Sequence, residues 1–113
     1  MAVIGYLFAA IPVSDLDRAA AWYERFAGRE ADLVPNEREL AWRMSETGWV
    51  CLILDAEHAG SARHTILVDD LDEFLAALGE RGIASEPVEQ LGGGARRAIA
   101  VDPDGNRMSV GQP

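Results

Sequence analysis

The side chains of this chain that could do chemistry include two histidines and one cysteine. His58 lies close to Asp55 and Glu57, and a histidine with carboxylates can bind a metal, but this spacing fits no usual site and predicts a solvated loop. Cys51 stands in the apolar run of residues 50–54. A thiolate nucleophile needs an open, electropositive setting, so the run predicts a small buried side chain instead. No catalytic residue is predicted from either group, and no Ser/His/Asp arrangement is indicated.

The acidic residues gather at two places, Asp15 with Asp17 and Asp69 with Asp70 and Asp72. Each place marks the start of a predicted helix, where an acid caps free N–H groups and faces the positive end of the helix dipole. Capping therefore explains both groups without catalysis. The formal net charge of −9 argues against a nucleic-acid partner, since phosphate binding needs a basic patch, and it is compatible with a cationic ligand.

The aromatic residues are the strongest candidates for ligand binding, because three tryptophans are many for 113 residues. Trp22 falls on the apolar stripe of the first predicted helix and is assigned to the core. Trp42 and Trp49 fall on neighbouring predicted strands joined by a short turn, which would place them near one another. Aromatic side chains on a concave sheet stack on flat ligands and attract cations, whereas the alternative is that each tryptophan fills the core.

The elements that must position these residues repeat once along the chain. Residues 13–17 (Val-Ser-Asp-Leu-Asp) match residues 68–72 (Val-Asp-Asp-Leu-Asp) at an offset of 55 residues. The apolar periodicity of the first half predicts a strand at 5–13, a helix from its cap Ser14 to Gly28, and strands at about 30–34, 39–44 and 49–54. The second half predicts a strand at 63–68, a helix from its cap Asp69 to Gly82, and strands at about 83–88, 95–101 and 107–111.

Each half therefore follows the order β-α-β-β-β, and neither half alone can bury its apolar face. We expect an α+β fold in which two tandem βαβββ modules, at about 1–56 and 61–113, form one domain over residues 1–113. Their strands would form a curved mixed sheet around a cavity, with the helices on the outer face. The apolar opening run is too short to span a membrane, and no basic residue precedes Arg18. We therefore expect no membrane partner and a cytoplasmic location.

Several motifs resemble a known superfamily, the vicinal oxygen chelate proteins, which include glyoxalase, the extradiol dioxygenases and the bleomycin-resistance proteins. In the first half the motifs are residues 11–19 (Ile-Pro-Val-Ser-Asp-Leu-Asp-Arg-Ala), 22–23 (Trp-Tyr) and Gly28. In the second half they are residues 68–71 (Val-Asp-Asp-Leu) and 102–106 (Asp-Pro-Asp-Gly-Asn). The resemblance covers nearly the whole chain and implies the paired-module fold.

The resemblance also implies three metal-ligand positions, and this chain places Phe8, Arg63 and Ser109 there. Phenylalanine has no donor atom, arginine stays protonated, and a serine hydroxyl is a poor ligand for a divalent ion. We therefore predict no metal ligand, no cofactor and no catalytic residue, which disfavours an enzyme. His64 stands one residue from the expected place, so in a strand it would face the other way unless a bulge restores it.

The sequence thus favours a metal-free small-molecule-binding protein that sequesters an aromatic or cationic antibiotic or metabolite, in the manner of an antibiotic-resistance protein. The alternative is a metal-dependent lyase, isomerase or dioxygenase of the same superfamily with an atypical ligand set. The partners we expect are a small organic ligand and a second copy of the chain in a homodimer. The residues predicted to line the ligand site are Phe8, Trp42, Trp49, Arg63 and Ser109.

Overall fold

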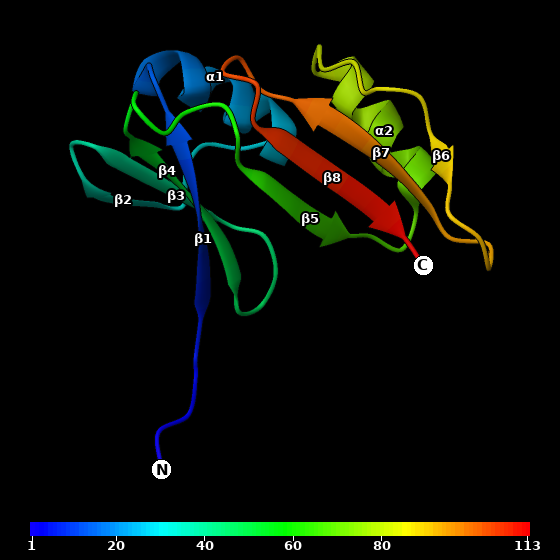
Figure 1. Ribbon diagram of the computed structural model, residues 1–113, viewed down its shortest axis with the longest axis horizontal. Coiled ribbons are helices and arrows are strands. Elements are labelled where there is room, and N and C mark those ends of the chain that lie inside the picture. The colour runs from blue at the N-terminus through cyan, green and yellow to red at the C-terminus, as the bar shows by residue number, and fades with distance from the viewer.

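The computed structural model describes residues 1–113, and its elements repeat one order twice (Figure 1). The first module contains β1 (Leu7–Val13), α1 (Leu16–Ala27), β2 (Leu33–Asn36), β3 (Glu39–Arg43) and β4 (Gly48–Leu54). The second module contains β5 (Arg63–Leu67), α2 (Leu71–Glu80), β6 (Glu89–Gln90), β7 (Arg96–Val101) and β8 (Arg107–Gln112). The predicted α+β class and the tandem βαβββ modules are confirmed.

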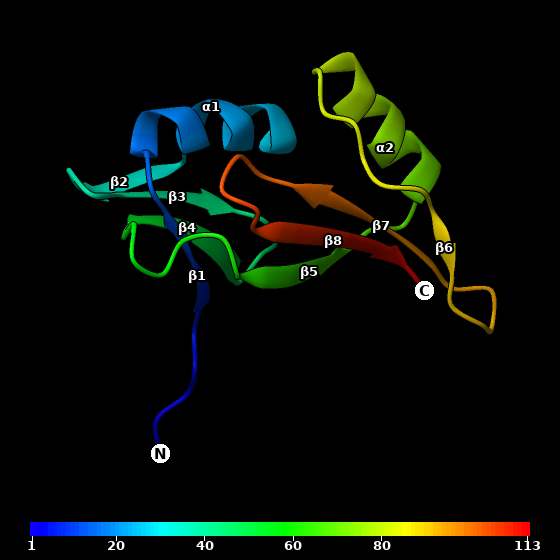
Figure 2. The same ribbon diagram turned by 45° about the horizontal axis from the view of Figure 1, so that its top comes forward.

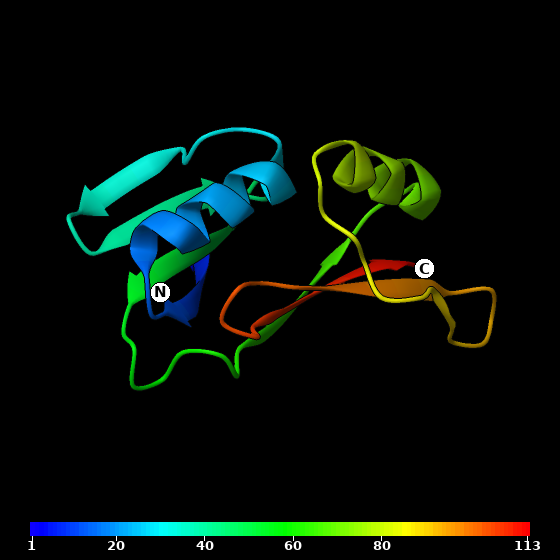
Figure 3. The same cartoon turned by 90° about the horizontal axis from the view of Figure 1, so that it is seen from above.

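The strands form two separate four-stranded sheets, in the orders β1-β4-β3-β2 and β5-β8-β7-β6. In each sheet the first strand of the module runs parallel to the last one, and the other neighbours are antiparallel. Figures 2 and 3 show both helices on the same side of the sheets. Each sheet therefore has a helix-covered face and an open face, and the mixed strands that the sequence predicted are divided between the two sheets.

The helix-covered faces hold the core. Helix α1 buries one stripe of side chains at helical spacing, which the sequence pattern predicts. Its partners come from alternate positions of the strands below, where residues i and i+2 share a face. The main core residues of the first module are Ala19, Trp22, Tyr23, Phe26, Ile11, Val13, Trp42, Val50 and Leu52.

Both helices begin one residue later than predicted. The N-cap of α1 is Asp15, whose carboxylate accepts a hydrogen bond from the Arg18 N–H at 3.0 Å. The N-cap of α2 is Asp70. Ser14 does not cap the helix, because its N–H and hydroxyl donate hydrogen bonds to the carboxylate of Asp104 in the second module.

Residues 83–88 do not form the expected strand, and only β6 extends the second sheet. Pro87 lacks an N–H group, and the segment reaches β7 through one bond, from the Glu86 N–H to the Ile99 carbonyl at 2.8 Å. At the other end of the chain, residues 1–6 extend away from both modules (Figure 1). Val3 and Ile4 are about nine-tenths exposed. Neither helix is long and apolar enough to cross a membrane.

A cleft between the modules as the candidate functional site

The hairpin between β7 and β8 joins the two modules through three residues, Asp102, Asp104 and Asn106, which we call the clamp. Asp102 is buried, and its carboxylate accepts bonds from the N–H groups of Asp104 and Asn106, both at 2.9 Å. The Tyr23 hydroxyl of α1 donates to the same carboxylate at 2.8 Å. Burial and then the charge of Asp102 raise the pKa of Tyr23, so this hydroxyl stays protonated. Asp104 accepts a hydrogen bond from the Ser14 N–H at 3.0 Å.

Asn106 uses both ends of its amide in the clamp. Its Nδ2 donates to the carbonyl of Pro12 in β1 at 2.9 Å. Its Oδ1 accepts from the N–H groups of Gly60 and Ala62, both at 3.0 Å. Gly60 has a φ of +101°, and a Cβ there would lie 2.6 Å from the backbone oxygen of Asp104. The clamp therefore fixes one end of the joint between the modules, and the connecting loop needs glycine at this point.

A cleft of about 440 Å³ opens elsewhere between the modules. Strands β1 and β4 form one wall, β5 forms the other, and the turn between β3 and β4 contributes to it. Most of its lining residues are apolar, which is typical of small-molecule sites. The cleft is lined by Leu7, Ala9, Met44, Ser45, Gly48, Trp49, Val50, His64, Thr65, Ile66 and Leu67.

Of the predicted site residues Trp49 alone lines this cleft, and Phe8, which lies outside the lining, stacks on it. Phe8 and Trp49 are opposite one another in the register of β1 and β4, on the open face of the first sheet. Their rings stack with centroids 5.2 Å apart and an interplanar angle of 20°. Phe8 remains 48% exposed, so part of this ring can contact a ligand. The Nε1 atom of Trp49 is the one buried side-chain nitrogen or oxygen without a hydrogen-bond partner.

Trp42 does not lie beside Trp49, so the expectation that both line one cavity is wrong. In the register of β3 and β4 Trp42 is opposite Val50, which places it on the helix-covered face. It is fully buried against Tyr23, with ring centroids 6.1 Å apart. Its Nε1 donates to the Arg29 carbonyl at 3.0 Å, which satisfies the polar atom of a core residue.

The other two predicted residues, Arg63 and Ser109, lie on the open face of the second sheet. Ser109 of β8 is opposite Thr65 of β5 in the strand register. Both line a pocket of about 220 Å³ together with Arg97 and Leu67. Because Thr65 and Leu67 also line the cleft, the pocket and the cleft share part of the wall formed by β5.

The residues at the implied metal positions do not fit a divalent metal. Phe8, Arg63 and Ser109 supply no ligand set, and no group of three or more His, Cys, Asp or Glu side chains gathers elsewhere. His64 lies in a regular stretch of β5, so no bulge turns it to the open face. Its Nε2 lies 3.0 Å from the carbonyl of Ala10 in β1.

The other candidate side chains occupy structural positions. His58 pairs with Asp55 at 2.9 Å in the exposed connecting loop. Cys51 is buried on the open face of the first sheet, with its Sγ 3.5 Å from a carboxylate oxygen of Glu39. Burial first, and then Glu39, raise the pKa of the Cys51 thiol to about 11. The thiol is therefore neutral at physiological pH and a poor nucleophile.

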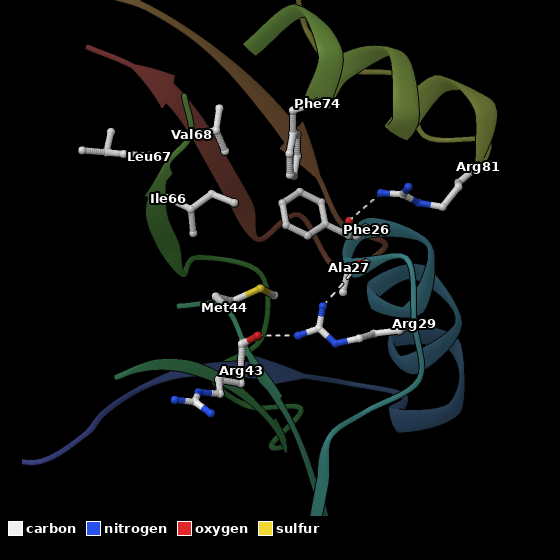
Figure 4. Close-up of a pocket in the computed structure, with 10 residues that line it drawn as sticks. All are labelled: Phe26, Ala27, Arg29, Arg43, Met44, Ile66, Leu67, Val68, Phe74 and Arg81. Atoms are coloured by element: carbon white, nitrogen blue, oxygen red, sulfur yellow. Dashed lines mark hydrogen bonds between the residues drawn. The ribbon is translucent and has the colours of Figure 1, made fainter. Parts of the chain in front are cut away.

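A second pocket, of about 170 Å³, lies on the helix side of the same joint (Figure 4). Phe26 and Phe74 meet edge to face there, with centroids 5.7 Å apart. Arg81 donates to the carbonyl of Phe26 at 3.0 Å, and Arg29 donates to the carbonyl of Arg43. Because these arginines bind backbone carbonyls, the pocket belongs to the joint between the modules. We therefore place the candidate site in the cleft.

Of the eleven lining residues sequence reasoning selected only Trp49; the others include Met44, Ser45, Thr65 and Leu67. The alternation along β5 carried a usable signal for two of them, because Thr65 and Leu67 share a face with Arg63. The turn that contains Met44 and Ser45 carried none. Its position depends on how the modules meet, which a local pattern does not encode.

The geometry defines a protein of paired βαβββ modules with an apolar cleft at the joint. The family model for the glyoxalase/bleomycin resistance protein/dioxygenase superfamily matches residues 5–110. The chain belongs to this superfamily. A comparison with curated protein sequences gives no match.

Solved structures agree with this assignment. A glyoxalase/bleomycin resistance protein from Catenulispora acidiphila is 35% identical, with a TM-score of 0.90 over 96% of this chain and 97% of that one. TnmS3, an antibiotic binding protein from Streptomyces sp. CB03234, is 28% identical, with a TM-score of 0.78 over 100% and 98%. A lactoylglutathione lyase from Agrobacterium tumefaciens shares the fold at 23% identity, with a TM-score of 0.77 over 94% and 91%.

Proposed function

We propose that this protein binds a small, flat organic molecule in the cleft without a metal ion and without transforming it. The observation that supports this most directly is Trp49, which lines an open, largely apolar cleft and stacks on Phe8. Stacked aromatic side chains bind planar ligands through large contact areas at low conformational cost. The residues at the implied metal positions favour binding without a metal, because they offer no ligand set.

The ligand that we propose is an antibiotic or a metabolite with an aromatic ring system. The likeness to an antibiotic binding protein at 28% identity supports this ligand class. Sequestration is a binding function, so it needs affinity and a shielded surface but no acid, base or nucleophile. The neutral thiol of Cys51 and the backbone-bound His64 agree with such a site.

We further propose a homodimer in the cytoplasm. The apolar residues Val3, Ile4 and Tyr6 are exposed, and they belong to the N-terminal segment that extends away from both modules (Figure 1). A run of exposed apolar residues often marks an interaction surface. Strands β1 and β5 both stand at the edge of their sheets. An unpaired edge is a template for another strand, so a second copy is a suitable partner. The single buried, free thiol is compatible with a reducing compartment.

The binding proposal is tested by titrating a panel of flat aromatic and cationic antibiotics while tryptophan fluorescence is recorded. We expect saturable quenching for at least one aromatic compound. Trp49→Leu should weaken that binding by about three- to tenfold, the usual contribution of an aromatic stack. Trp42→Phe is the control and should leave the affinity unchanged, since Trp42 lies in the core. Absence of saturable binding across the panel would overturn the proposal.

The metal-free character is tested separately by elemental analysis of the purified protein and by thermal shift with Zn²⁺, Ni²⁺ and Fe²⁺. We expect no stoichiometric metal and no large rise in melting temperature. Stoichiometric metal would favour a metal-dependent lyase, isomerase or dioxygenase instead. The dimer is tested by size-exclusion chromatography with light scattering, where a monomer mass contradicts it.

A further inference from the structure

The open face of the second sheet carries several cations around the buried Ser109. Arg63 and Thr65 alternate along β5, and their register partners on β8 are Arg107 and Ser109. Arg97 of β7 lines the pocket beside Ser109. This grouping is unusual for a chain with a formal net charge of −9.

The ion pairs on this face leave one cation free. Arg97 pairs with Glu89 at 2.5 Å, and Arg107 pairs with Glu86 at 2.8 Å. Arg63 is exposed and has no carboxylate within 4.0 Å. Arg97 holds the pKa of Glu89 below its usual value, with smaller contributions from Arg63 and Arg107, so the three guanidinium groups act on one region. The face therefore has one unneutralised positive charge.

Ser109 lines the pocket beside these cations. The residue is 1% exposed, and its hydroxyl makes no hydrogen bond within the protein. Because this hydroxyl lines the pocket and makes no bond to the protein, it can donate a hydrogen bond to an acceptor on a ligand. The hydroxyl of Thr65, opposite Ser109 in the register, can bind the same acceptor.

We propose that this face is an anion subsite and that the ligand of the cleft is an aromatic oxyanion, a ring system with a carboxylate, sulfonate or phosphate group. The oxyanion accepts hydrogen bonds from Ser109 and Thr65 and is attracted by Arg63, while the ring stacks on Trp49 in the cleft. The inference rests on the proposed binding function of the cleft. The net charge of −9 is compatible with a cationic ligand, whereas the positive charge of this face favours an anionic one.

The test compares two fluorescent probes that share one ring system. 8-Anilinonaphthalene-1-sulfonate carries a sulfonate, and N-phenyl-1-naphthylamine is its neutral counterpart. We expect the anionic probe to bind more tightly at low ionic strength and to lose this advantage as salt is added. Arg63→Gln should weaken the anionic probe by about fivefold and leave the neutral probe unchanged. Arg25→Gln, an exposed change of the same charge on α1, is the matched control.

Ser109→Ala is a second variant, and it should fold normally because the hydroxyl that it removes has no partner. We expect it to weaken the anionic probe by about threefold, the loss of one hydrogen bond. Equal affinity for both probes, or equal effects of Arg63→Gln and Arg25→Gln, would overturn the anion subsite. If the neutral probe still binds and Trp49→Leu weakens it, the cleft remains a binding site. If neither probe binds, both proposals fail.

Discussion

Replacing Asn106 by alanine should destabilise the protein more than any surface substitution. The amide of Asn106 makes four hydrogen bonds between 2.9 and 3.0 Å, to Pro12, Asp102, Gly60 and Ala62. Alanine removes all four and leaves their partners unpaired at a buried joint. At about 1 kcal/mol each, the free energy of unfolding should fall by about 4 kcal/mol. That is a large part of the roughly 5–15 kcal/mol that holds a domain together.

The measurement is urea unfolding followed by tryptophan fluorescence, with the slope m compared between variants. The control is Asn36→Ala at the end of β2, where the amide is exposed and bonds only to near neighbours. It should cost about 0.5 kcal/mol. An Asn106→Ala variant that loses no more stability than this control would refute the role that we assign to the clamp.

Three further changes probe the same joint and the buried thiol. Tyr23→Phe removes one bond to Asp102 and should lower the free energy of unfolding by about 1 kcal/mol; no loss in urea would contradict that role. Gly60→Ala should lower the free energy of unfolding by roughly 2–3 kcal/mol, because Gly60 has a positive φ and a Cβ there would lie 2.6 Å from a backbone oxygen. Gly79→Ala is the control: Gly79 lies in α2 with open space around it, so alanine should raise the free energy of unfolding by about 0.5–1 kcal/mol. The Cys51 thiol has a pKa of about 11 in the folded protein and about 8.5 in the unfolded chain. At pH 8 it should therefore react with iodoacetamide roughly tenfold or more slowly in the folded protein. The free energy of unfolding should decline as the pH rises above about 8.5, because the unfolded chain then loses the thiol proton first. Equal labelling rates would show that the thiol is accessible and ionised.

The fold was largely predictable because its signals are local. The repeated Val-x-Asp-Leu-Asp segment predicted both helix starts to within one residue, and the spacing of apolar residues predicted the buried stripe of α1. The one-residue error at Ser14 arose because its hydroxyl binds Asp104, far along the chain. The missing strand at 83–88 has a local cause, since Pro87 removes a donor that a sheet needs.

The site was harder to predict because it depends on how the modules meet. Phe8 and Trp49 fall opposite one another through the parallel pairing of β1 and β4, which connects residues far apart in sequence. Trp42 was expected on the same face as Trp49. The register of β3 and β4 pairs Trp49 with Arg43, so Trp42, one residue earlier, faces the other way, and a turn one residue longer or shorter would reverse this. Thr65 shares a face with Arg63, but a lone threonine is common in strands, so its residue type does not distinguish a ligand contact from an ordinary strand position.

The clamp and the cleft occupy corresponding places in the repeat. Two residues that bind the clamp have counterparts at the offset of 55 residues that line the cleft. Ala62 corresponds to Leu7, and Pro12 corresponds to Leu67. Where the second module offers the clamp hairpin, the first offers the shorter turn of Met44 and Ser45. The cleft therefore lies at the joint that has no counterpart of the clamp, so the asymmetry between the two modules leaves the space in which we propose that a ligand binds.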